Sequence, residues 1–213
     1  MNPSSDPTLL YFADPMCSWC WGFSPVIHRI RDSVDVPIQM FMGGLNPGNR
    51  ASMTAEDKDT LREHWQQVQQ MTGRDFDFAF FEREGFVYDT EPACRAVIAC
   101  FQLSDEQALS FMSYLQQAFY TSNRDITDAS VLASLAAEFG LDATRFNRLM
   151  ADPETVKITN LCFRYARHLK ISGFPTLIGQ SAGAHTVLTR GFQSVENIQP
   201  AIQAWLDQTI SSR

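Results

Sequence analysis

Two cysteines separated by two residues lie near the start of the chain, and their spacing is the strongest chemical signal in the sequence. Cys17 and Cys20 follow an apolar, strand-like segment at residues 8–13 and precede a helical pattern. A C-x-x-C pair between a strand and a helix is typical of thiol–disulfide exchange. We therefore expect a redox-active dithiol.

The expected helix assigns different roles to the two thiols. If the helix begins near Cys17, the sulfur of that residue lies beside the unsatisfied N–H groups of the first turn, which favour a thiolate. Cys20, one turn later, is then inside the helix and less exposed. Cys17 is thus predicted to be the attacking thiol, and Cys20 is predicted to resolve the mixed disulfide.

Zinc binding is the main alternative use of this spacing, with inert core thiols as the other. Structural zinc sites normally need a second pair of ligands. The remaining cysteines form no second C-x-x-C, and the histidines are scattered. These residues are Cys94, Cys100, Cys162, His28, His64, His168 and His185. The pattern favours dithiol chemistry and no metal.

The elements next to the dithiol read as strand, helix, strand. Residues 8–13 and 36–42 are short apolar runs, and between them Phe23, Val26, Ile27 and Ile30 recur at the spacing of one helical face. Such a unit implies parallel strands with a right-handed crossover. Near the C-terminus, strands at residues 174–178 and 186–189 flank a turn at 179–183, and a closing amphipathic helix follows.

The residues between these two parts are predicted to be helical. Capping-box patterns at Thr54 and Ser104 each precede a helical apolar pattern, Thr90 and Asp128 precede two more, and glycines end two of the four. Further helices are expected from about residue 142 and over residues 153–168. Strand signals are missing over this length, which indicates a helical insertion.

The composition excludes several classes of partner. The 213 residues carry a net charge of −7, which argues against a nucleic-acid surface or a basic membrane face. No run of residues approaches the length of a membrane span, and the N-terminus has no apolar signal segment. With only five cysteines, the sequence predicts a cytoplasmic protein whose thiols are mostly reduced.

The ordered combination of four motifs is more specific than the C-x-x-C alone. The motifs are Phe12-Ala-Asp-Pro-Met-Cys17-Ser-Trp-Cys20-Trp21, Met42-Gly-Gly-Leu45, Thr90-Glu-Pro-Ala-Cys-Arg-Ala96 and Ser172-Gly-Phe-Pro-Thr176. Together they resemble the DsbA-like branch of the thioredoxin superfamily, and in particular bacterial proteins described as predicted cytoplasmic protein-disulfide isomerases. The resemblance covers almost the whole chain.

The resemblance implies an α/β thioredoxin fold (βαβ…ββα) that carries a large all-helical insertion. Residues 1–48 and 170–213 would form a discontinuous thioredoxin-like domain, and residues 49–169 would form the insertion. It also implies that Pro175 is held cis beside the catalytic pair Cys17 and Cys20, and that Phe174 touches bound substrate. The central dipeptide Ser18-Trp19 replaces the Pro-His of the secreted oxidant, so strong oxidising power is not implied.

Other residues near the dithiol have two interpretations each. Trp19 and Trp21 are candidates for an apolar substrate-binding rim, although core packing is at least as common a role for Trp21. Asp14 and Ser18 are expected to support the site, with Asp14 relaying a proton for Cys20 or ending the strand as a turn residue. His28 is expected to be structural.

The sequence therefore predicts a thiol–disulfide oxidoreductase or protein-disulfide isomerase without a bound cofactor. Its expected partners are protein or peptide thiols and disulfides, with glutathione or a thioredoxin-type reductant as redox partner. One alternative is a glutathione-dependent isomerase or transferase of the kappa/2-hydroxychromene-2-carboxylate isomerase type. Another is a non-catalytic peptide-binding module or chaperone that uses the apolar rim.

Overall fold

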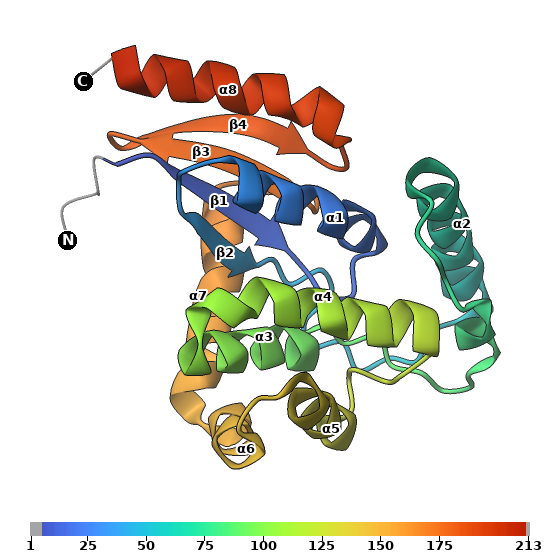
Figure 1. The fold of residues 1–213 in the computed structure, drawn as a ribbon. Helices are drawn as coiled ribbons and strands as arrows, with labels where there is room; N and C mark the ends of the chain where they lie inside the picture. The colour runs from blue at the N-terminus through green and yellow to red at the C-terminus, as the bar shows by residue number, and fades with distance from the viewer. Residues whose placement is uncertain (1–5, 212–213) are drawn as a thin grey trace.

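A four-stranded mixed sheet is the centre of the computed structural model, which describes residues 6–211. The strands are β1 (Thr8–Ala13), β2 (Ile38–Met42), β3 (Thr176–Ser181) and β4 (Ala184–Arg190), in the spatial order β2-β1-β3-β4 (Figure 1). β1 pairs in parallel with β2 and antiparallel with β3, and β3 and β4 form a hairpin. The parallel β1–β2 pair is the one predicted from the strand–helix–strand pattern.

Helices cover both faces of β1, which explains why every residue of that strand is buried. On one face, Leu9 and Tyr11 join a core cluster with α1 (Ser18–Ser33) and α8 (Val195–Ser211). On the other face, Leu10 and Phe12 pack against α7 (Pro153–His168). The alternation follows from the two-residue period of a strand. A strand buried on both faces reads as the continuous apolar run seen in the sequence.

The predicted helical block is present between β2 and β3 (Figure 1). It comprises α2 (Ala55–Thr72), the short helix η1 (Phe78–Glu82), α3 (Glu91–Leu103), α4 (Asp105–Ser122), α5 (Ala129–Phe139), α6 (Ala143–Ala151) and α7. Thr54 and Asp57 form a reciprocal capping box at the start of α2, and Gly73 ends it in a left-handed conformation. The α/β fold class with a helical insertion is confirmed.

Buried aromatic rings hold the insertion together and connect it to the sheet. Trp65 on α2 is fully buried, and its ring lies about 5 Å from the rings of Phe76, Phe80, Phe81 and Tyr120. This group belongs to the same core cluster as Leu9 and Tyr11 of β1. One continuous apolar core therefore ties the helices to β1, the strand that leads into the dithiol.

Three details differ from the sequence prediction. Ser104 precedes α4, but its side chain makes no capping hydrogen bond, so this capping box is not formed. β3 begins at Thr176 rather than residue 174, because the chain first passes through a cis bond at Phe174–Pro175. The hairpin turn comprises residues 182–183 instead of the predicted 179–183. Over residues 6–211, no helix combines the length and the apolarity that crossing a membrane requires.

Candidate active site

Cys17 lies at the N-cap position of α1, where the sequence predicts it. Its backbone is extended, its carbonyl accepts a hydrogen bond from the Trp21 N–H at 3.0 Å, and the helix proper begins at Ser18. The side chain makes no capping bond. As the N-cap residue, Cys17 stands at the end of the helix where the unsatisfied N–H groups and the positive end of the dipole lie.

Cys20 lies one turn further into α1 and is completely buried, whereas Cys17 keeps 6 % of its surface exposed. Burial raises the pKa of the Cys20 thiol well above its ordinary value, and the hydrogen bond and charge of Cys17 raise it further. A hydrogen bond from the backbone of Asp14 opposes this shift. Cys20 is thus a protonated, shielded thiol beside a more accessible one.

The loop before β3 closes over the dithiol. The Phe174–Pro175 bond is cis, as the resemblance implies, and the Cys17 thiol donates a hydrogen bond to the Phe174 carbonyl with a sulfur–oxygen distance of 3.5 Å. Thr176 Oγ1 donates to the Gly173 carbonyl at 2.8 Å and steadies the turn. The fold therefore brings Cys17, Phe174 and Pro175 together from distant parts of the sequence.

The ring of Phe174 lies directly on Gly43, at the end of β2. A Cβ atom added at Gly43 would lie 2.1 Å from Phe174 Cζ, which only a glycine avoids. The neighbouring Gly44 adopts a φ of +70°, which also favours glycine. The Gly-Gly pair was visible in the sequence as a strand end, but its contact with Phe174 was not.

Asp14 is a fully buried carboxylate beside the dithiol. Its Oδ1 accepts from the Met16 N–H at 2.9 Å, and its Oδ2 accepts from the Leu45 N–H at 2.7 Å and from the Cys94 thiol at 3.3 Å. Burial raises the pKa of Asp14, and these hydrogen bonds hold back part of the rise. Asp14 therefore ends the strand as a turn residue and also places a titratable group next to Cys20.

Cys94 and two tyrosines are residues near the site whose contacts the sequence did not reveal. The Cys94 thiol donates to the Asp14 carboxylate. The Tyr88 hydroxyl donates to the Met16 carbonyl, one residue before Cys17. Burial first, and then the charges of the two redox cysteines, raise the pKa of Tyr11 well above its ordinary value. The dithiol therefore lies in surroundings of low polarity.

The two tryptophans of the motif are placed differently. Trp19 is half-buried, with its ring centre 6.2 Å from that of Phe192. Trp21 is only 4 % exposed, its indole N–H donates to the Asp75 carbonyl at 3.1 Å, and the Arg74 guanidinium lies 3.2 Å from its ring centre. Burial favours core packing for Trp21 over the substrate contact that the sequence also left open. Trp19 alone of the pair has surface for a ligand.

Ser18 and His28 both lie on α1, and His28 connects it to α4. Ser18 is the first helical residue and is buried, which places it beside the dithiol as expected. His28 Nε2 lies 2.9 Å from the hydroxyl of Ser113 on α4, and that hydroxyl lies 2.8 Å from the Ser24 hydroxyl. Burial, followed by the charge of Arg31, lowers the pKa of His28. These contacts fit the structural role expected for His28.

A metal centre needs several ligand side chains that converge on one point. Over residues 6–211, no group of three or more histidine, cysteine, aspartate or glutamate side chains converges closely enough to hold a metal ion. All five cysteines are free thiols in this structure. The chemistry that the arrangement can perform is therefore that of a slightly exposed thiol, a fully buried thiol and a carboxylate.

A family comparison decides the class of this chain. The model of the DsbA-like thioredoxin domain matches residues 8–203, which is most of the sequence. The chain belongs to the DsbA-like thioredoxin domain family. This membership confirms the branch, the fold and the enzyme class expected from the motifs, a DsbA-like thiol–disulfide oxidoreductase.

Solved structures of similar proteins agree with the family match. A candidate protein disulfide isomerase from Nitrosomonas europaea is 35% identical, with a TM-score of 0.90, and the alignment covers 95% of this chain and 98% of that one. The cytosolic disulfide reductase DsbM from Pseudomonas aeruginosa is 25% identical, with a TM-score of 0.78 and coverage of 94% and 99%. DsbM has also been solved with GSH, at a TM-score of 0.76.

A curated relative has a different description. The ClpXP adapter protein SpxH of Bacillus subtilis (strain 168) is 25% identical over 181 residues, which is 83% of this chain. The chain spans only 59% of the length of that relative. This similarity therefore concerns a shared domain rather than the whole adapter.

Proposed function

We propose that this protein catalyses thiol–disulfide exchange through Cys17 and Cys20. The observation that carries the proposal is the position of Cys17: at the N-cap of α1, partly exposed, and hydrogen-bonded to the carbonyl before the cis proline. The Cys17 thiolate attacks one sulfur of a substrate disulfide, the S–S bond breaks, and the other substrate sulfur leaves as a thiolate. Cys17 is then joined to the substrate in a mixed disulfide.

The second half of the reaction uses the buried pair. Cys20 transfers its thiol proton to the Asp14 carboxylate, and its sulfur attacks Cys17 to release the substrate as a second thiolate. The substrate disulfide is reduced, and the Cys17–Cys20 pair is oxidised. Burial raises the pKa of Asp14, which makes its carboxylate a stronger base than an exposed aspartate, and it also raises the pKa of the Cys20 thiol that has to lose its proton.

The substrate contacts come from the surfaces beside Cys17. Phe174, with Pro175 holding the loop, and the half-buried Trp19 would contact the residues that flank the substrate disulfide. Proline has no N–H group, so its neighbours on the strand edge are left to pair with an extended peptide. We therefore propose protein or peptide disulfides as substrates, and isomerisation where the mixed disulfide is attacked by another substrate thiol.

We further propose that the enzyme works in the cytoplasm, with glutathione or a thioredoxin-type protein as reductant. Support comes from the 25% identical DsbM, which is described as a cytosolic disulfide reductase and has been solved with GSH. The Ser18-Trp19 dipeptide also supports a reducing role, because it lacks the histidine that would stabilise the thiolate in a strong oxidant.

The test is the reduction potential of the dithiol, measured by tryptophan fluorescence in glutathione buffers. A reductant of this kind should have a value nearer to about −270 mV, the thioredoxin range, than to about −120 mV, the range of the secreted oxidant. Cys17→Ser should abolish both the redox transition and reduction of a model disulfide, whereas Cys162→Ser on α7 should change neither. Activity that survives Cys17→Ser would contradict the proposal.

A second candidate function is protein binding without catalysis, and one surface favours it. A largely apolar groove of about 580 Å³ runs beside β2, at the edge of the sheet, and includes Met40, Leu109 and the half-exposed Phe101. If this groove is functional, a variant without both redox cysteines should still protect a denatured model protein from aggregation. Phe101→Asp should remove that protection. Dependence of the protection on the cysteines would refute this candidate.

A further inference from the structure

The buried Asp14 carboxylate is held by two segments that carry neither redox cysteine. One is the loop after β2, whose Leu45 N–H donates to Oδ2 at 2.7 Å. The other is the start of α3, where Thr90 and Cys94 lie one turn apart and are both fully buried. The Cys94 N–H donates to the Thr90 carbonyl at 3.1 Å, so the first turn of the helix fixes the two residues relative to each other. Positions four apart in a helix lie on one face, so both side chains meet the same neighbour.

Both of these α3 side chains donate hydrogen bonds to Asp14. The Cys94 thiol donates to Oδ2, with a sulfur–oxygen distance of 3.3 Å. A hydrogen bond from the Thr90 side chain also lowers the pKa of Asp14. Within residues 6–211 no ion pair reaches Asp14, so hydrogen bonds rather than a cation stabilise its charge. Loss of one donor would therefore leave the buried charge less well compensated.

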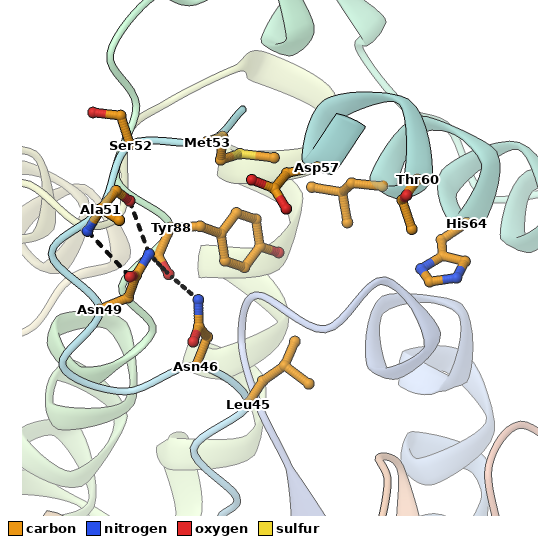
Figure 2. A pocket seen from close by; sticks show the side chains of 11 residues that line it. Leu45, Asn46, Asn49, Ala51, Ser52, Met53, Asp57, Thr60, His64 and Tyr88 are labelled. Atoms are coloured by element: carbon orange, nitrogen blue, oxygen red, sulfur yellow. Dashed lines mark hydrogen bonds between the residues drawn. The ribbon is translucent and has the colours of Figure 1, made fainter. Parts of the chain in front are cut away.

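The loop after β2 orients the Thr90 hydroxyl. The Asn46 N–H donates to Thr90 Oγ1 at 3.1 Å. Asn46 is itself fixed, because its side-chain amide donates to the Tyr88 carbonyl at 2.9 Å (Figure 2). A hydroxyl whose oxygen accepts a hydrogen bond still has its own proton to donate. The contact with Asn46 therefore leaves the Thr90 proton for Asp14.

The Cys94 thiol is oriented in the same way. Burial, followed by the charge of Asp14, raises the pKa of Cys94 well above its ordinary value, so the thiol keeps the proton that it donates. A hydrogen bond from the Gly44 backbone opposes this shift, and it ends on the sulfur that donates to Asp14. Three successive backbone groups, at residues 44–46, therefore contact Cys94, Asp14 and Thr90 in turn.

Other titratable groups face Asp14 and its donors. The two redox cysteines face it from α1, and Tyr88 faces it from the segment before α3. Burial raises the pKa of Tyr88 well above its ordinary value, so this phenol is neutral at neutral pH. On α3 itself, the charge of Glu91 helps to raise the pKa of Cys94, and Glu91 forms an ion pair with Arg95 at 3.1 Å. The charge that the α3 donors influence most directly is that of Asp14.

We propose that Thr90 and Cys94 are positioning residues that hold Asp14 as the proton acceptor for Cys20. The assignment rests on the proposed exchange reaction and gives a role to the sequence motif that contains both residues. In that reaction the proton leaves the Cys20 sulfur for the Asp14 carboxylate, a bond forms between the sulfurs of Cys20 and Cys17, and the bond from Cys17 to the substrate sulfur breaks. Without the α3 donors, Asp14 stays protonated to higher pH, and less of it is free to take this proton at neutral pH.

The first test measures the titration of Asp14 without any exchange reaction. In reduced protein that carries carboxyl-labelled aspartate, carbon NMR follows each carboxyl as the pH changes, and the signal missing from Asp14→Asn identifies Asp14. The midpoint should move to higher pH in Cys94→Ala and recover in Cys94→Ser, whose hydroxyl restores a donor. Cys100→Ala, the same change at a fully buried thiol on the same helix, should leave the midpoint unchanged.

The second test measures release of the substrate from the mixed disulfide. Rapid acid quench and intact mass follow the adduct between the protein and a disulfide-bonded peptide as it forms and decays. At neutral pH the decay should slow about tenfold in Cys94→Ala, a part of the roughly 10²–10⁴-fold that a general base contributes. The pH profile of the decay should shift to higher pH in this variant, and both the rate and the profile should recover in Cys94→Ser.

Thr90 supplies a second pair of variants in case Cys94→Ala does not fold, which circular dichroism shows. Thr90→Val replaces the hydroxyl with a methyl group and should raise the Asp14 midpoint, whereas Thr90→Ser keeps the hydroxyl and should not. Wild-type midpoints in the folded alanine and valine variants would overturn the inference. A raised midpoint with an unchanged release profile would also overturn it, because Asp14 would then not accept the proton. Loss of the exchange proposal would instead appear as activity that persists in Cys17→Ser, whatever the Asp14 midpoints are.

Discussion

The contact between Gly43 and Phe174 allows the sharpest prediction, because it joins backbone packing to the redox site. Alanine at position 43 would place a methyl group 2.1 Å from Cζ, 2.2 Å from Cε1 and 2.7 Å from Cε2 of the Phe174 ring. Carbon atoms pack favourably at about 3.5–4.0 Å, so the ring has to move by roughly 1.4 Å or more. The ring is attached to the residue whose carbonyl accepts the Cys17 thiol hydrogen bond.

The expected cost of such overpacking is about 1–3 kcal/mol of unfolding free energy. Because the displaced residue also supplies the carbonyl that accepts the Cys17 thiol hydrogen bond, the Gly43→Ala variant should lose exchange activity even at temperatures where it is fully folded. A loss of about tenfold corresponds to about 1.4 kcal/mol in the transition state for attack.

Two measurements check this prediction: urea unfolding of the reduced protein, and the rate at which it reduces a model disulfide. Gly173→Ala is the matched control, since a Cβ there meets no atom within 4 Å although the residue lies in the same loop. The control should retain stability and rate. Wild-type values of both quantities in Gly43→Ala would refute the reasoning that Phe174 is held against Gly43 and positions Cys17.

Three further predictions concern charge and packing. Burial raises the pKa of Asp14, so between the ordinary pKa of an aspartate and this raised pKa the native state binds more protons than the unfolded chain, and stability falls as the pH rises. In Asp14→Asn this fall should disappear from urea unfolding. Release of the mixed disulfide should also slow in this variant, by about 10²-fold or more. The pKa of His28 is lowered in the native protein, so as the pH drops the unfolded chain takes up a proton at this residue before the native protein does. Stability therefore falls as the pH drops below about 6.5, and His28→Gln should reduce this loss in melts between pH 5 and 8. A Cβ at Gly179 would lie 2.3 Å from the Trp205 ring. Gly179→Ala should therefore lower the unfolding free energy by about 1–3 kcal/mol without changing the exchange rate of the folded protein. An unchanged unfolding free energy would contradict the packing of α8 on β3.

The elements of this fold were predictable because each depends on local chemistry. The apolar run at residues 8–13 identifies a buried strand, and the Thr54 cap with Gly73 delimits a helix, since both signals act within one or two turns of the chain. Ser104 shows the limit of such signals, because the residue precedes a helix and its hydroxyl still makes no cap.

The support around the dithiol was not predictable, because its partners are distant in sequence. Cys94 reaches Asp14 across 80 residues, and Tyr88 reaches Met16 across 72, with nothing in the spacing of either pair to indicate contact. The resemblance supplied the cis Pro175, which Gly-Phe-Pro-Thr alone does not specify. The reactive pair was therefore visible in the sequence, whereas the carboxylate and hydroxyl contacts around it required the fold.

The most direct test of the central claim is to trap the mixed disulfide. The Cys20→Ser variant, incubated with a disulfide-bonded peptide and analysed by intact mass and peptide mapping, should accumulate a one-to-one covalent adduct on Cys17, because the thiol that would resolve it is gone. The Cys17→Ser variant should form no adduct at the active site, since Cys20, the thiol of the pair that it keeps, is fully buried and protonated. An adduct on Cys20 in the second variant, or no adduct on Cys17 in the first, would contradict the assignment of Cys17 as the attacking thiol.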